Sequence, residues 1–190
     1  MKSLTHEKSE VKLSCRNVWK IYGVQPDQFF DRAQGKVANP EKLADKLRDA
    51  AHIVANANVS FDVHTGEIFV IMGLSGSGKS TIVRCLSRLV EPTAGEILLD
   101  GQDLLKKSDA ELTDIRRHKM GMVFQSFGLM PHLSVIDNIA FPLKLQGVGK
   151  AERYEQATRV IDLVGLNGRE SNFPKELSGG QQQRVGIARS

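Results

Sequence analysis

A glycine-rich loop near the middle of the chain constrains the fold more than any other feature. Residues 73–80 fit the pattern G-x-x-x-x-G-K-[ST], and Thr81 follows at once. The run before the loop, Glu67 to Met72, is short, apolar and β-prone, as a buried parallel strand should be. The run after it, Thr81 to Val90, spaces its apolar residues as a helix does. We therefore expect a strand, a glycine loop and a helix in succession.

This succession predicts a site for the phosphates of a nucleotide. Glycines let backbone N–H groups curl around phosphate oxygens, and the helix start adds about half a positive charge from its dipole. Lys79 would reach the β- and γ-phosphates, and the Ser80 hydroxyl would coordinate Mg²⁺. The alternative, a Gly/Ser-rich turn, needs neither Lys79 nor the strand before it. The residues expected at the phosphates are Gly73, Ser75, Gly76, Ser77, Gly78, Lys79, Ser80 and Thr81.

A second stretch near the end of the sequence is suited to an anion. Leu177 is followed by Ser178, Gly179, Gly180 and Gln181, and the residues from Gln182 to Ser190 look helical. A serine and two glycines at a helix start offer a hydroxyl and unhindered N–H groups. An N-cap serine with flexible glycines gives the same string for a purely structural reason. Two such helix starts in one chain favour the anion-binding interpretation.

The remaining pattern indicates an α/β protein with a mostly helical block from about residue 126 to 178. We expect strands over residues 11–22, 59–63, 96–99 and 120–124, and helices over residues 39–54, 108–118, 150–164 and 182–190. Ser134 should cap a further helix, which Pro142 should kink or interrupt.

Bulk properties suit a single cytoplasmic domain, with room for a subdomain. The chain has 190 residues, and its net charge of +4 is spread along it, which gives no support for nucleic-acid binding. Met1 to Lys8 lacks the apolar segment of a signal peptide, and no apolar run approaches the roughly 18 residues that cross a bilayer. Cys15 and Cys85 are expected to be reduced thiols in or near the core.

With these motifs in place, the chain resembles the ATP-binding subunits of ABC transporters over nearly its whole length. Residues 177–181 match the signature sequence of that family, and Gln125 matches its Q-loop glutamine. Tyr22 resembles the aromatic residue that stacks on adenine. Residues 70–81, residues 123–132 and the insert after Tyr22 are most similar to the glycine betaine/proline (quaternary amine) uptake subset.

The resemblance implies a P-loop NTPase of the ABC ATPase type, with an antiparallel β subdomain and a helical subdomain. Residues 1–125 would form the nucleotide-binding core and β subdomain, with a helical insert at 24–56. Residues 126–178 would form the helical subdomain, and residues 179–190 would begin the return helix to the core.

The resemblance also implies binding of Mg-ATP between two copies arranged head to tail, beneath a transmembrane permease that a substrate-binding protein serves. Residues 127–132 would lie under the permease, although their apolar side chains suit a core equally well. The subunit would be peripheral on the inner face of the cell membrane. The nucleotide would contact Tyr22, the loop residues 73–81 and Gln125 of one copy and Ser178, Gly179, Gly180 and Gln181 of the other, with Ser80 and Gln125 at the metal.

The family pattern is incomplete in this sequence. No apolar strand ending in Asp-Glu and no later γ-phosphate histidine follow the signature before Ser190. We therefore expect an incomplete version of a longer subunit, with an unfinished core sheet and weak or no turnover. Lys79 and Gln125 are the catalytic candidates present, and the general base is absent. The alternatives are a soluble ABC ATPase acting on nucleic acid or translation, and a nucleotide-binding regulator without hydrolysis.

Overall fold

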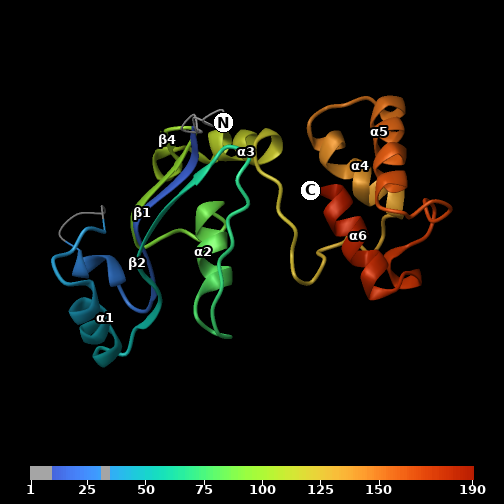
Figure 1. The fold of residues 1–190 in the computed structure, drawn as a ribbon. Helices are drawn as coiled ribbons and strands as arrows, with labels where there is room; N and C mark the ends of the chain where they lie inside the picture. Colours follow the sequence, from blue (N-terminus) through green and yellow to red (C-terminus); the bar gives the residue numbers. More distant parts are fainter. Residues whose placement is uncertain (1–9, 31–34) are drawn as a thin grey trace, which may run out of the picture. The chain divides into compact units, whose positions relative to one another are not determined.

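The computed structural model describes residues 10–30 and 35–190, which fall into two compact units, Met1–Asp109 and Ala110–Ser190 (Figure 1). The first residues, 1–8, for which we expect no signal segment, lie outside the described part, as do residues 31–34 of the insert. The division at residues 125/126 stays a prediction.

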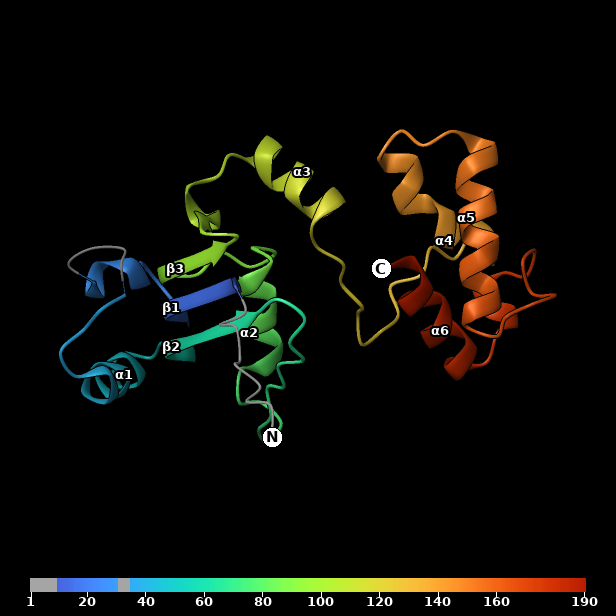
Figure 2. The same ribbon diagram turned by 45° about the horizontal axis from the view of Figure 1, so that its top comes forward.

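The first unit is built on a four-stranded antiparallel sheet of order β2-β1-β3-β4. The strands are β1 (Val11–Tyr22), β2 (Ile53–His64), β3 (Ala94–Leu99) and β4 (Gln102–Asp103). Helix α2 (Lys79–Leu86) contacts β1 and β2, and Figure 2 shows it alongside these strands. Because the glycine loop leads directly into α2, the sheet holds the loop through this helix.

Helix α1 (Pro40–Asp49) packs against the C-terminal end of β1. Asn39 caps it, since its side chain accepts a hydrogen bond from the Lys42 N–H at 2.9 Å. Leu47 of α1 packs with Trp19 and Ile21 of β1 in a buried cluster. The Trp19 indole donates to the Gly35 carbonyl at 2.8 Å, which ties the insert to the sheet. A 3₁₀ turn over Pro26–Phe29 precedes the helix.

Two expected strands are absent from the described residues. Glu67 to Met72 and Met120 to Phe124 form no strand, and the side chains of Ile68 and Met72 are 90% and 85% exposed. The prediction of a buried strand before the loop is therefore wrong for this structure. The physical reason is pairing: a strand needs a neighbour to bond its backbone, and no described strand lies beside either run.

Some predicted helix boundaries are also wrong. The helix expected over residues 39–54 ends at Asp49. Ala51 adopts φ 60°, and Val54 lies in β2, where it pairs with Ile21 of β1. The helix expected from Thr81 to Val90 begins at Lys79 and ends at Leu86. In both places tertiary contacts outweigh the apolar periodicity that extended the prediction.

The second unit is helical. It contains α3 (Asp109–His118), which starts at the unit boundary, with α4 (Val135–Leu145), α5 (Lys150–Leu163) and α6 (Gly179–Arg189). Ser134 caps α4 as predicted. Helix α4 continues through Pro142 to Leu145, so Pro142 does not interrupt it. Short 3₁₀ turns occupy Leu104–Lys106 in the first unit and Pro174–Glu176 in the second. The core of the second unit includes Val135, Ile139, Ala140, Ala157, Ile161, Leu166, Leu177 and Val185.

A buried asparagine fixes the segment before α4. Asn138 is fully buried, and its amide donates to the carbonyls of Met130, Leu133 and Ser134 while its oxygen accepts from the Met130 N–H. Leu129 packs against the helical core. The interpretation of this segment as core is therefore confirmed for Leu129. None of the helices formed by the described residues is both long and apolar enough to cross a bilayer.

Both cysteines are free and buried, as predicted. Burial raises the pKa of Cys15 to about 12, helped by neighbouring Cys85 and Asp62. Burial likewise raises the pKa of Cys85 to about 11. A buried thiol that ionises so late is a poor nucleophile at neutral pH.

We expect iodoacetamide to label neither cysteine in the native chain at neutral pH and both in denaturant, with mass spectrometry as the measurement. The folded pKa values lie above the unfolded value of 9.0, so the stabilisation from neutral thiols is complete below pH 9. It should be lost as the pH rises through about 11 to 12. Prompt labelling of native Cys15 or Cys85 would contradict this prediction.

Candidate functional site

The glycine loop and the first turn of α2 are built as the motif predicts. Gly76 and Gly78 adopt φ of 78° and 83°, the left-handed region that favours glycine. Gly78 is the residue before α2, and its carbonyl accepts the first helical hydrogen bond, from the Ile82 N–H at 2.9 Å. The Lys79 ammonium bends back over the loop and donates to the Leu74 carbonyl at 2.5 Å and the Ser77 hydroxyl at 3.3 Å. The first turn of the helix and the lysine therefore face the same short loop.

The two glycines of this turn are required for different reasons. A Cβ at Gly78 would lie 2.0 Å from the Ala55 carbonyl oxygen, a distance that no real contact reaches. A Cβ at Gly76 would meet nothing within 4 Å. Gly78 is thus needed for space and conformation, whereas Gly76 is needed for conformation alone.

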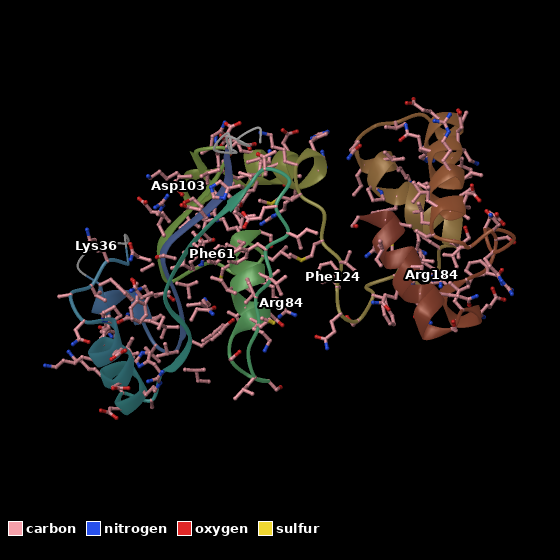
Figure 3. All side chains as sticks on the ribbon, in the orientation of Figure 1. Lys36, Phe61, Arg84, Asp103, Phe124 and Arg184 are labelled. Carbon is pink, nitrogen blue, oxygen red and sulfur yellow. The ribbon has the colours of Figure 1, made fainter. Side chains whose placement is uncertain are left out.

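A cavity of about 400 Å³ adjoins the loop. Phe61 of β2 and Phe69 line it and stack with ring centroids 4.6 Å apart, and Ile82 lines it from α2. Figure 3 labels Phe61 among the side chains of the first unit. Ser77 and Lys79 supply polar groups at the same cavity. This space combines apolar walls with a cation and a hydroxyl, as small-molecule sites often do.

Tyr22 ends β1 with an exposed ring. It pairs with Ile53 across the sheet, its side chain is 44% exposed, and the Lys20 ammonium lies 4.7 Å from the ring centroid. An exposed aromatic face is what stacking on a base requires. Tyr22 lies in the same unit as Lys79.

The remaining predicted site residues belong to the second unit. Gln125 and Ser126 are exposed in a turn, and Phe127 and Gly128 follow with φ of 59° and 58°. The Arg189 guanidinium of α6 donates to the Gly128 carbonyl at 2.7 Å and the Phe127 carbonyl at 3.3 Å. Burial lowers the pKa of Arg189 from its usual value. Arg189 therefore holds the turn after Gln125 to the helix that follows Ser178.

The signature stretch forms a capped helix start. The Ser178 hydroxyl accepts from the Gln181 N–H at 3.4 Å, and the Gln181 side chain accepts from the Ser178 N–H at 2.9 Å. This is the capping box of α6. The structural alternative for Ser178 is thus realised. Gly179 and Gly180 are different, because they are exposed and have open space around them.

Sequence reasoning missed two residues that shape these sites. Asn56 contacts the glycine loop from β2, and Arg189 contacts the turn after Gln125. An asparagine within a β-prone run is an available signal for the first, since asparagine is depleted in strands. No local pattern distinguishes Arg189.

Comparison with known families decides the identity of the fold. Residues 56–190 match the family model described as ABC transporter.

The chain belongs to the ABC transporter family.

Curated relatives and solved structures agree with this membership. The chain is 55% identical over 178 residues to the trimethylamine N-oxide transport system ATP-binding protein TmoW of Ruegeria pomeroyi, covering 94% of this chain and 51% of that protein. It is 47% identical over 180 residues to the glycine betaine/proline betaine transport system ATP-binding protein ProV of Escherichia coli, covering 95% and 44%. The chain thus spans about half the length of these ABC transporter relatives.

The fold resembles the ATP-binding cassette MJ0796, solved as a dimer in a post-hydrolysis state bound to ADP and Pi. The TM-score is 0.74 at 35% identity, covering 93% of this chain and 68% of that one. The predicted fold class, an ABC-type P-loop NTPase with an antiparallel β subdomain and a helical part, is confirmed.

We expect Gly78→Ala to destabilise the first unit of this ABC transporter chain well beyond Gly76→Ala. Both changes incur about 1–2 kcal/mol of left-handed strain, but only Gly78→Ala forces a methyl group against the Ala55 carbonyl. Urea unfolding followed by circular dichroism measures the free energy of unfolding of each variant. Equal losses would show that the contact with β2 does not constrain the loop.

Proposed function

We propose that this chain is the ATP-binding part of a subunit that hydrolyses ATP to drive import of a quaternary amine such as glycine betaine. The observation that carries the proposal is the glycine loop joined to the start of α2, in a member of the ABC transporter family. The relatives TmoW and ProV carry the solute preference in their names, and both are ATP-binding proteins of transport systems.

The residues present fit a nucleotide triphosphate. Gly76 and Gly78 adopt the left-handed backbone that suits a loop wrapped around phosphate, and the first N–H groups of a helix such as α2 have no partner within the helix. The Lys79 ammonium would leave the Leu74 carbonyl for the β- and γ-phosphates, exchanging a neutral acceptor for a charged one. The exposed ring of Tyr22 would stack on adenine.

Bound Mg²⁺ would supply charge neutralisation across the phosphates. Ser80 is exposed in the first turn of α2 and would hold the ion, with Thr81 beside it. We propose that Gln125 contacts the ion and the attacking water. No cluster of three or more His, Cys, Asp or Glu suited to a metal occurs among the described residues, so the metal would depend on the nucleotide.

A second copy would complete the site. Gly179 and Gly180 meet no neighbour that forbids a side chain, and they lie inside α6 without left-handed φ. Glycine at these two positions destabilises the helix start, and no contact in the fold requires it. Close approach of an anion to the backbone would account for both glycines. A head-to-tail dimer would bring them to the γ-phosphate held by Lys79 of the other copy.

The likeness to transport-system proteins supports three further parts of the proposal. The subunit would dock beneath a transmembrane permease at the inner face of the membrane, would serve a substrate-binding protein indirectly, and would not bind nucleic acid. Full turnover would need a general base to activate the attacking water.

Titration with Mg-ATP tests the loop directly. Lys79→Ala should weaken binding about 10- to 100-fold, because a hydrogen bond to a charged group contributes about 1.5–3 kcal/mol. Lys42→Ala on exposed α1 in the same unit is the matched control and should bind as wild type does. Equal affinities for Lys79→Ala and wild type would refute the proposed nucleotide site.

Helix stability tests the interpretation of the signature glycines. Gly180→Ala should raise the free energy of unfolding of the second unit by up to about 0.5 kcal/mol, because alanine is the better helix former and the first turn gains less than a helix interior would. Gly165→Ala, at φ 65° after α5, should lower it. Thermal unfolding of both variants is the measurement, and a destabilised Gly180→Ala would mean that the fold itself needs this glycine.

A further inference from the structure

Asn56 of β2 is buried against the junction between the glycine loop and α2. Its side chain is 8% exposed, and its amide Nδ2 donates to the Gly78 carbonyl at 3.2 Å. The preceding residue, Ala55, places its own carbonyl oxygen where a Cβ of Gly78 would stand. Two successive residues of one strand therefore contact the single residue that precedes α2.

This contact fixes the direction of the peptide between Gly78 and Lys79. The Gly78 carbonyl accepts from both Asn56 Nδ2 and the Ile82 N–H, so its oxygen is held at two points. A trans peptide is planar, and its N–H points opposite to its C=O. The Lys79 N–H is therefore held pointing out of the first turn of α2, toward the side where a helix start binds an anion.

A contribution to folding stability does not explain why residue 56 is an asparagine. Its other side-chain atom, Oδ1, is buried and has no hydrogen-bond partner within residues 10–30 and 35–190. An unpaired buried acceptor destabilises a fold, and an apolar side chain of similar size avoids that penalty. The Gly78 carbonyl would keep its bond to the Ile82 N–H without Asn56, so the loss of the amide leaves no unpaired carbonyl.

We propose that Asn56 is a positioning residue for the phosphate loop, which orients the Lys79 N–H toward the phosphates through the Gly78 carbonyl. The inference rests on the proposed ATP binding at this loop and goes beyond it, because Asn56 lies on β2 and outside the motif. Its effect should fall on the phosphates, not on the base.

The experiment compares Asn56→Leu and Asn56→Asp with wild type and with Asn58→Asp. Asn58 lies on the same strand, and its side chain accepts from Asn17, away from Gly78. Asn58→Asp keeps that acceptor and tolerates the φ of 52°, so it controls for the added charge. Affinities for Mg-ATP come from titration calorimetry, affinities for adenosine from equilibrium dialysis, and melting temperatures from circular dichroism.

We expect Asn56→Leu to bind Mg-ATP about 2- to 10-fold more weakly, the range for one hydrogen bond, with adenosine affinity unchanged. Its melting temperature should equal or exceed that of wild type, because the unpaired Oδ1 is gone. Asn56→Asp should lose more Mg-ATP affinity than Asn58→Asp, because it removes the donor and sets a carboxylate against the Gly78 carbonyl.

The outcomes separate this inference from the proposed function. Wild-type affinity in Asn56→Leu overturns the positioning role alone. A parallel loss of Mg-ATP affinity, adenosine affinity and melting temperature would show a purely structural role and would also overturn it. A wild-type chain that binds no Mg-ATP overturns the proposed function and this inference together.

Discussion

The contact between β2 and Gly78 is the constraint on which the candidate site depends. A helix start can hold an anion only if its first N–H groups are fixed in direction, and fixed direction requires something rigid behind the turn. Here the carbonyl of Ala55 and the amide of Asn56 provide that support from a strand paired on its far side with β1. The loop is thereby held by the antiparallel sheet, although the run before it forms no strand.

The sequence predicts best those features that neighbouring residues determine. The caps at Asn39 and Ser134 are visible because each cap bonds a backbone N–H three residues away. The runs at residues 67–72 and 120–124 have strand composition, yet a strand is completed by its partner, and composition says nothing about whether one is present. The roles of Asn56 and Arg189 were not predicted, because their hydrogen-bond partners Gly78 and Gly128 lie 22 and 61 residues away along the chain.

The glycines of the two motifs illustrate a difference that the sequence hides. Those at 76 and 78 have backbone angles that other residues rarely adopt, so the fold explains them. Those at 179 and 180 are in ordinary helix with open space around them, so the fold does not. Two glycine-rich stretches of similar sequence therefore differ in how far the fold requires their glycines, and the three-dimensional structure shows this difference.

Arg189 gives the helical unit a mechanical property. One guanidinium near the end of α6 bonds the carbonyls of Phe127 and Gly128, while Ser178 begins the same helix at its opposite end. Because α6 is one continuous helix, a tilt of its first turn must either displace the turn at residues 127–128 or break the hydrogen bonds that Arg189 makes to it. A displacement of Ser178 would therefore be coupled to the turn at residues 127–128, next to Gln125.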